Sequence, residues 1–194
     1  MHFIGNFQWK ADTEISNEQK IQIRQYLGPH YFIILTWRSN HLSSYLIAIA
    51  NLLFTGRFGK YSHSLMNVED DVASEVDFRL VEAIGTGVQY SPFDSVFNVQ
   101  RVCLLKPKNM SLDKWTCILD RAKTELGKPY DSLFDLKTDT ALSCVELVRI
   151  ALMAEPDYKE NFANFEAMIA KGKNLTPYMF RACPDFEVVF EVRA

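Results

Sequence analysis

The chain has 194 residues, which is enough for one well-buried domain and short for two. Its 48% hydrophobic and 23% charged residues are the content of an ordinary globular protein. The net charge of −3, with lysine and arginine scattered along the chain, gives no electrostatic case for binding nucleic acid. We therefore expect one globular domain that has no nucleic-acid partner.

The cysteines and the apolar segments limit the compartment. Cys103, Cys117, Cys144 and Cys183 match neither a disulfide framework nor a C-x-x-C metal pattern. The first residues lack the charged and apolar regions of a signal peptide. The longest apolar stretch, residues 45–54, has ten residues, about half of a membrane span. We expect free thiols, no transmembrane segment and a cytoplasmic location.

Hydrophobic periodicity and turn residues predict helices and strands that do not alternate strictly. Helices are expected over residues 16–27, 43–54, 111–126, 144–154 and 159–171. Strands are expected over residues 31–37, 61–69, 77–84, 96–105 and 186–192. A Gly85-Thr86-Gly87 turn follows the third strand. This mixture indicates an α+β fold.

The segment Ser143-Cys144-Val145-Glu146 places a cysteine at the predicted start of a helix. Serine followed three residues later by glutamate, before an apolar run, is the capping-box pattern. A thiol at the first helical position faces the positive end of the helix dipole and N–H groups that have no helical partner. Both lower the pKa of the thiol, and the N–H groups can hold an oxyanion. The alternative is a buried structural cysteine.

A histidine and a glutamate on two predicted strands are candidate partners of this thiol. His63 shares a strand face with Tyr61 and Leu65, a setting that also suits a hydrogen-bonded core histidine. Glu82 shares a face with apolar residues, and a carboxylate is seldom buried without a partner. A neighbouring imidazole N–H would satisfy it, because the carboxylate fixes the tautomer and stabilises the imidazolium. An exposed Glu82 on an edge strand is the alternative.

Several motifs together resemble the circularly permuted branch of the NlpC-type papain-like superfamily, close to YiiX-like proteins. They occur in the expected order over residues 30–194, and residues 1–29 are left as an N-terminal extension. The motifs are Phe32-Ile-Ile-Leu-Thr36, Leu42-Ser-Ser44, Tyr61-Ser-His63-Ser, Leu80-Val-Glu82-Ala, Gly127-Lys-Pro-Tyr130-Asp131, Phe134-Asp135, Ser143-Cys144-Val-Glu146-Leu-Val148 and Thr176-Pro177. The resemblance implies a permuted papain-like fold, with an antiparallel sheet or partial barrel packed against helices.

The resemblance also implies the roles of the site residues. Cys144 would be the nucleophile, His63 the base and Glu82 the third polar member. Tyr130 matches a tyrosine that lines the substrate cleft, and Asp131 would stand beside it, where it suits an amine; alternatively, Asp131 caps a turn. His41, between a strand and a helix, is a candidate pocket residue. No pair of histidines has metal-ligand spacing, so we expect neither a metal nor a cofactor.

Three functions fit these residues. The first is a cysteine hydrolase, amidase or peptidase that cleaves a small peptide or amino-acid amide through a thioester. The second is a lipid acyl hydrolase or acyltransferase of the lecithin–retinol-acyltransferase-like type, with residues 43–54, Phe54 and Phe58 accepting the chain. That helix is otherwise simply core. The third is a non-catalytic ligand-binding module. The oligomeric state is left open.

Overall fold

The computed structural model describes residues 14–27, 30–39, 41–55, 59–68, 79–132, 140–171 and 175–194. Its strands are β1 (Ile33–Trp37), β2 (His63–Val68), β3 (Arg79–Ile84), β4 (Gly87–Pro92), β5 (Arg101–Pro107) and β6 (Phe186–Arg193). Its helices are α1 (Asn17–Leu27), α2 (Leu42–Thr55), α3 (Phe93–Val96), α4 (Leu112–Thr124), α5 (Cys144–Leu152), α6 (Tyr158–Asn161), α7 (Ala163–Ala170) and α8 (Pro177–Ala182). The α+β class is confirmed.

The strands form one open sheet of six strands in the order β4-β3-β2-β1-β5-β6, and each neighbouring pair is antiparallel. The β1–β2 register pairs Thr36 with His63, so the histidine stands at the end of the sheet where β2 begins. The β2–β3 register pairs Leu65 with Glu82. Since side chains alternate along a strand, His63 and Glu82 lie on one face as diagonal neighbours.

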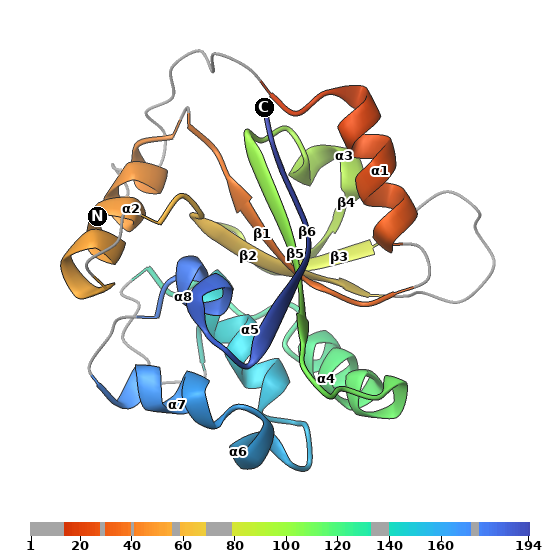
Figure 1. Ribbon diagram of the computed structural model, residues 1–194, viewed down its shortest axis with the longest axis vertical. Helices are drawn as coiled ribbons and strands as arrows, with labels where there is room; N and C mark the ends of the chain where they lie inside the picture. The colour runs from red at the N-terminus through yellow and green to blue at the C-terminus, as the bar shows by residue number, and fades with distance from the viewer. Residues whose placement is uncertain are drawn as a thin grey trace.

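Each face of the sheet packs against its own set of helices (Figure 1). Strand residues such as Leu35, Met66 and Val81 point to the face covered by α4, α5, α7 and α8. The alternate residues Ile34 and Leu65 point to the other face, toward α1 and α3. The central strands are apolar on both faces because both faces are covered.

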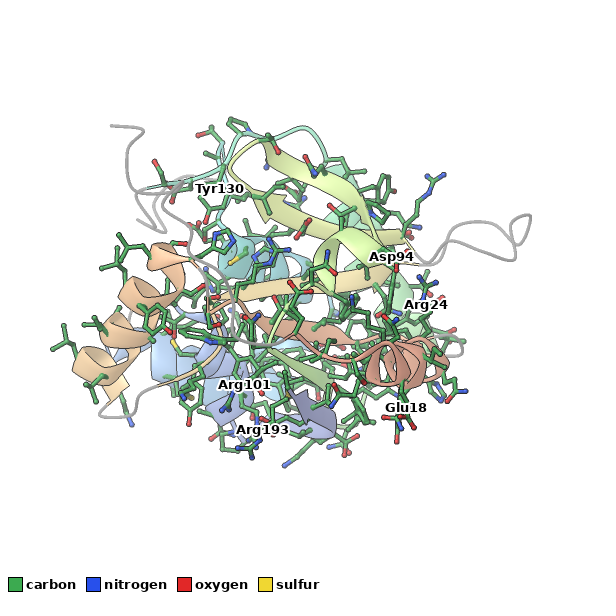
Figure 2. All side chains as sticks on the ribbon, turned by 90° about the horizontal axis from the view of Figure 1, so that it is seen from above. Glu18, Arg24, Asp94, Arg101, Tyr130 and Arg193 are labelled. Atoms are coloured by element: carbon green, nitrogen blue, oxygen red, sulfur yellow. The ribbon has the colours of Figure 1, made fainter. Side chains whose placement is uncertain are left out.

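The predicted helix over residues 16–27 is part of this second core. Ile23 and Leu27 of α1 are buried together with Phe93 of α3. On the surface, Arg24 lies over the Phe93 ring and donates to Asp94 over 2.8 Å (Figure 2). The described part of residues 1–29 therefore packs on the same sheet as the rest of the chain.

The structure differs from the predicted elements in several places, and strand β4 was not predicted. Residues 96–105 are not one strand, because a short helix, α3, ends at Val96 and β5 begins only at Arg101. The stretch 159–171 is two helices, α6 and α7, broken at Phe162. The Thr176-Pro177 turn opens helix α8, where the fixed φ of proline suits the first helical position. None of the described helices is long and apolar enough to cross a membrane.

We expect the Asn67→Leu substitution to lower the free energy of unfolding by about 2–4 kcal/mol. The buried Asn67 side chain accepts from the Phe32 N–H over 2.7 Å and donates to the His30 carbonyl over 2.8 Å. Leucine would leave these backbone groups without partners. Urea unfolding followed by circular dichroism measures the change. As a control, Asn98→Ala, at an exposed asparagine, should change stability by less than about 0.5 kcal/mol. Equal effects would contradict this account of Asn67.

Candidate active site

Cys144 is the first residue of helix α5. Ser143 is the N-cap: its hydroxyl accepts from the Glu146 N–H, and the Glu146 carboxylate accepts from the Ser143 N–H over 2.8 Å. The capping box predicted from the sequence is therefore confirmed. The N–H groups of Cys144 and Val145 are therefore the first two of helix α5. They lie beside the sulfur, at the positive end of the helix dipole.

The start of α5 is fixed to strand β2 by a side chain of the strand. The Ser64 hydroxyl donates to the Cys144 backbone carbonyl over 2.9 Å, and both groups are buried. Ser64 follows His63 directly, so this bond holds the helix start next to the histidine. Ser64 points to the α5 face of the sheet, whereas His63 points to the other. His63 is the first residue of β2, and the thiol meets its ring at that end of the strand.

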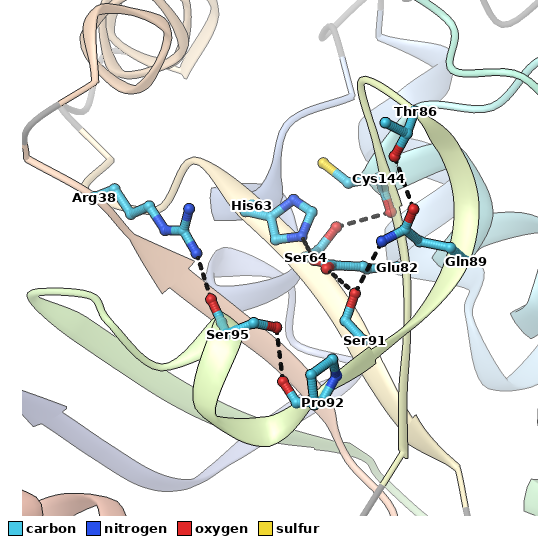
Figure 3. A network of polar contacts seen from close by, with 10 residues as sticks. All are labelled: Arg38, His63, Ser64, Glu82, Thr86, Gln89, Ser91, Pro92, Ser95 and Cys144. Atoms are coloured by element: carbon cyan, nitrogen blue, oxygen red, sulfur yellow. Dashed lines mark hydrogen bonds and ion pairs between the residues drawn. The ribbon is translucent and has the colours of Figure 1, made fainter. Parts of the chain in front are cut away.

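His63 stands between the sulfur and a carboxylate (Figure 3). The His63 Nε2 and Glu82 Oε2 atoms are 2.6 Å apart. Because an ionised carboxylate only accepts hydrogen bonds, Nε2 carries the proton and Nδ1 faces Cys144. The Glu82 side chain is 8% exposed and that of His63 is 22% exposed, so solvent reaches the pair mainly from the histidine side.

The other oxygen of Glu82 is held by strand β4. The Ser91 hydroxyl donates to Glu82 Oε1. The Gln89 amide donates to the Ser91 hydroxyl over 3.4 Å and accepts from the Thr86 hydroxyl over 2.7 Å (Figure 3). Sequence reasoning missed Gln89 and Ser91 because it stopped at the Gly85–Gly87 turn. The alternation of Val88 and Tyr90 with these polar residues is the signal that would have revealed the strand.

The electrostatics of the site favour a thiolate beside an imidazolium. Burial raises the pKa of Cys144, but hydrogen bonding to His63 and the charge of its ring lower this pKa below the ordinary value, with help from Ser64. Burial lowers the pKa of His63, but Cys144 and Glu82 together raise it above the ordinary value. Burial also raises the pKa of Glu82, and His63, Ser91 and Arg38 outweigh it, so that pKa is lowered. These shifts favour a protonated His63 between a deprotonated Cys144 and a deprotonated Glu82.

Tyr130 is close enough to Cys144 for the two side chains to interact. Burial, followed by the negative charges of Cys144, Asp131 and Glu146, raises the pKa of its phenol. Its loop is tied to the β3–β4 hairpin, because Val88 N–H donates to the Lys128 carbonyl over 2.8 Å. Gly87, at φ 114°, makes that approach possible: a Cβ there would lie 2.5 Å from the Lys128 oxygen. Asp131, half-buried, follows Tyr130 at the same place.

His41 is not hydrogen-bonded to the other candidate catalytic residues. It lies just before α2, and burial together with the positive charge of Arg38 lowers its pKa. No hydrogen bond or ion pair among the described residues joins His41 to Cys144, His63 or Glu82. Its role as a pocket residue stays a prediction.

Neither of the other two buried cysteines is activated. Burial raises the pKa of both Cys103 and Cys183 to about 12. Cys117 is exposed on α4, and all four thiols are free. Of the three buried cysteines, Cys144 has a lowered pKa, whereas those of Cys103 and Cys183 are raised.

A cavity of about 530 Å³ lies at the other end of β1 from the triad. It is lined by residues that precede β1, end β5 or begin α4, including Tyr31, Lys106 and Trp115. His63, by contrast, pairs with Thr36 near the close of β1. The residues that line the cavity do not include Cys144, His63 or Glu82.

The fold is similar to that of the metalloprotein YiiX from Escherichia coli O157:H7, known from a crystal structure. The TM-score is 0.60 at 20% sequence identity, and the match covers 86% of this chain and 99% of the YiiX chain. At this identity the likeness shows a shared fold and does not transfer an activity. No model of a protein family matches the sequence, and no curated protein matches it either.

The described residues do not fit a resident metal ion at the triad. They contain no group of three or more His, Cys, Asp or Glu side chains that could hold a metal. At the triad, both Glu82 oxygens and His63 Nε2 are occupied by hydrogen bonds, which leaves the Cys144 sulfur and His63 Nδ1. A catalytic zinc site takes three protein ligands.

We expect iodoacetamide to alkylate Cys144 preferentially in a Cys117→Ser protein, because only a thiolate attacks it. The rate should fall with decreasing pH only below the ordinary range of a cysteine, since the pKa of Cys144 is lowered. In a His63→Gln protein the inflection of the rate against pH should move to higher pH. Burial would then raise the pKa of Cys144 without the opposing effect of the His63 charge. Peptide mass spectrometry identifies the labelled site. Dominant labelling of Cys103 or Cys183, or an unmoved inflection, would count against activation by His63.

Proposed function

We propose that the chain is a cysteine-dependent hydrolase with Cys144 as nucleophile, His63 as acid and base, and Glu82 as the residue that orients His63. One observation carries the proposal: the His63 ring lies between the Cys144 sulfur and a buried carboxylate that has no other cation within hydrogen-bonding distance among the described residues. A structural cysteine would need neither the helix start nor the ion pair.

In the first half of the reaction, the Cys144 thiolate attacks the substrate carbonyl carbon and a carbon–sulfur bond forms. The N–H groups of Cys144 and Val145, at the positive end of α5, stabilise the oxyanion. The His63 imidazolium then gives its Nδ1 proton to the leaving amine as the carbon–nitrogen bond breaks. The product is a thioester on Cys144 beside a neutral histidine.

In the second half, His63 Nδ1 takes a proton from a water molecule that attacks the thioester carbon. The carbon–sulfur bond breaks, the acid leaves and the thiolate–imidazolium pair is restored. Glu82 keeps the proton on Nε2 throughout, so Nδ1 is always the atom that exchanges a proton. Ser91 holds Glu82 in the orientation that this requires.

The chain shares its fold with YiiX, and we further propose that it belongs to the permuted NlpC-type papain-like group. The order His63, Glu82, Cys144 is the permuted order, in which the cysteine helix follows the histidine strand. We assign the metal named for YiiX no role here, because the triad offers too few ligands. The superfamily assignment rests on these motifs and on their meeting at one end of the sheet.

The substrate we favour is a small peptide or amino-acid amide. Tyr130 lies near the sulfur on the loop that leads from α4, and Asp131 follows it in the chain; a carboxylate there suits a substrate amine. The second candidate is acyl hydrolysis or transfer on a lipid, and the exposed leucines of α2 are the observation that favours it. Of the predicted chain acceptors, Phe58 and the side chain of Phe54 lie outside the described part of the structure.

We expect the purified protein to hydrolyse aminoacyl esters and amides faster than long-chain fatty acyl esters. Turnover of two matched ester panels measures the preference. Cys144→Ala should abolish turnover, and Glu82→Gln should reduce kcat about tenfold or more, because His63 loses its orientation. Cys117→Ala, at an exposed thiol, should leave kcat unchanged.

Selective cleavage of fatty acyl esters, lost in Cys144→Ala, would replace the amide substrate with the lipid one. Turnover that survives Cys144→Ala would overturn the hydrolase mechanism. No turnover of either panel, together with binding of an aminoacyl compound, would favour the non-catalytic module.

We also expect kcat/KM to follow a bell-shaped curve against pH. Activity should fall on the acid side as the Cys144 thiolate is protonated, and this limb lies low because its pKa is lowered. It should fall on the alkaline side as His63 loses the proton that the leaving amine needs, and this limb lies high because its pKa is raised. Glu82→Gln should move the alkaline limb to lower pH. An unmoved limb would contradict the assignment to His63.

A further inference from the structure

Helix α2 turns an apolar stripe toward solvent. Leu53 is 76% exposed, and Leu46, Ile49 and Leu52 are each close to half exposed. The spacing of Leu42, Leu46, Ile49 and Leu53 puts them on one side of the helix. On the opposite side, the buried residues among those whose side chains are described are the small Ser44 and Ala48.

The helix carries no charge over its 14 residues. Helix α4, of 13 residues, differs from α2 because it has charged residues, Asp113, Asp120 and Lys123, on its exposed side. Apolar residues that gather on one exposed face in this way mark a surface that meets something other than water.

The sequence on either side of α2 carries charges of one sign. From residue 19 to residue 68 the sequence has no aspartate or glutamate, whereas the whole chain has a net charge of −3. The same stretch contains the cations Lys20, Arg24, Arg38, Arg57 and Lys60. Lys20 and Arg24 lie on α1 and bind Asn98 and Asp94, whereas Arg38 and Lys60 flank α2 in the sequence. Lys60 is exposed. An uncharged apolar stripe bordered by cations complements a surface of anionic lipid headgroups.

The length of α2 indicates how it would meet a lipid surface. At about 1.5 Å per residue it is roughly 21 Å long, less than the bilayer core of about 30 Å, so it would lie along the surface. A second copy of the chain is a poorer partner. The stripe covers only two heptads, fewer than the three or four of a coiled coil, and the helix itself has no charged residue beside the stripe to set a register.

We propose that α2 docks the chain on an anionic lipid surface, with its leucine stripe at the headgroup boundary and Lys60 near the phosphates. The Ser44 hydroxyl donates to the Ser62 hydroxyl over 2.8 Å, and Ser62 immediately precedes His63. Docking through α2 therefore brings the His63 end of the sheet to the lipid. The proposal depends on the helix and not on the chemistry of Cys144.

Sedimentation with vesicles tests the proposal. The full chain should bind vesicles of phosphatidylcholine mixed with phosphatidylglycerol, and more weakly those of phosphatidylcholine alone or at high salt. Leu53→Glu should weaken binding at least about tenfold, because a carboxylate would enter the apolar boundary. Lys60→Gln should weaken binding to the anionic vesicles about fivefold.

Leu112→Glu is the matched control, since Leu112 is 66% exposed at the start of α4, away from the stripe. It should bind like the unaltered protein, and thermal unfolding should show that both leucine variants are folded. Cys144→Ala should bind fully, which separates failure of docking from failure of hydrolysis. Absence of vesicle binding, or equal binding by Leu53→Glu, would overturn the proposal. A dimer that Leu53→Glu dissociates, without vesicle binding, would overturn it in favour of a second copy.

Discussion

The hydrogen bond from Ser64 to the Cys144 carbonyl is the contact on which the site depends. It joins a strand and a helix that lie 80 positions apart in the chain, and it is buried. A buried hydroxyl without this partner would cost about 1–3 kcal/mol, so the helix start cannot slide along β2 without a penalty. Because His63 immediately precedes Ser64 in the chain, the same hydrogen bond fixes the position of the Cys144 sulfur relative to the imidazole.

The second constraint is the buried carboxylate of Glu82. Such a group is stable only when its charge is paired and its oxygens are hydrogen-bonded. His63 takes one oxygen and Ser91 the other, so both requirements are met by neighbouring strands of the sheet. Glu82 thereby orients the imidazole from the side opposite the sulfur. The charged imidazole in turn is the cation that stabilises the Cys144 thiolate. The network thus stabilises the fold and sets the protonation states of the site at the same time.

The sequence was enough to predict the parts of the structure that depend on local patterns. The Ser143–Glu146 capping box, the helix over residues 111–126 and the central strands have signals that lie within a few residues. The β4 strand was missed because the prediction stopped at the Gly85–Gly87 turn, although Val88 and Tyr90 alternate with Gln89 and Ser91 beyond it. Ser64 and Ser91 were not singled out, because a serine on a strand shows no sign of its partner. Such contacts arise only when the strands and α5 pack together.

The structure of α2 bears on which substrate reaches Cys144. An acyl channel would require the apolar surface of this helix to continue toward the sulfur. Instead, the side of α2 that faces β2 presents the Ser44 hydroxyl, bonded to Ser62 next to His63, and the leucines point away. A polar contact therefore separates the apolar stripe from the end of the sheet that holds the proposed triad. This separation suits a helix that docks the protein at a lipid surface while a polar substrate, such as an amide, enters beside Tyr130.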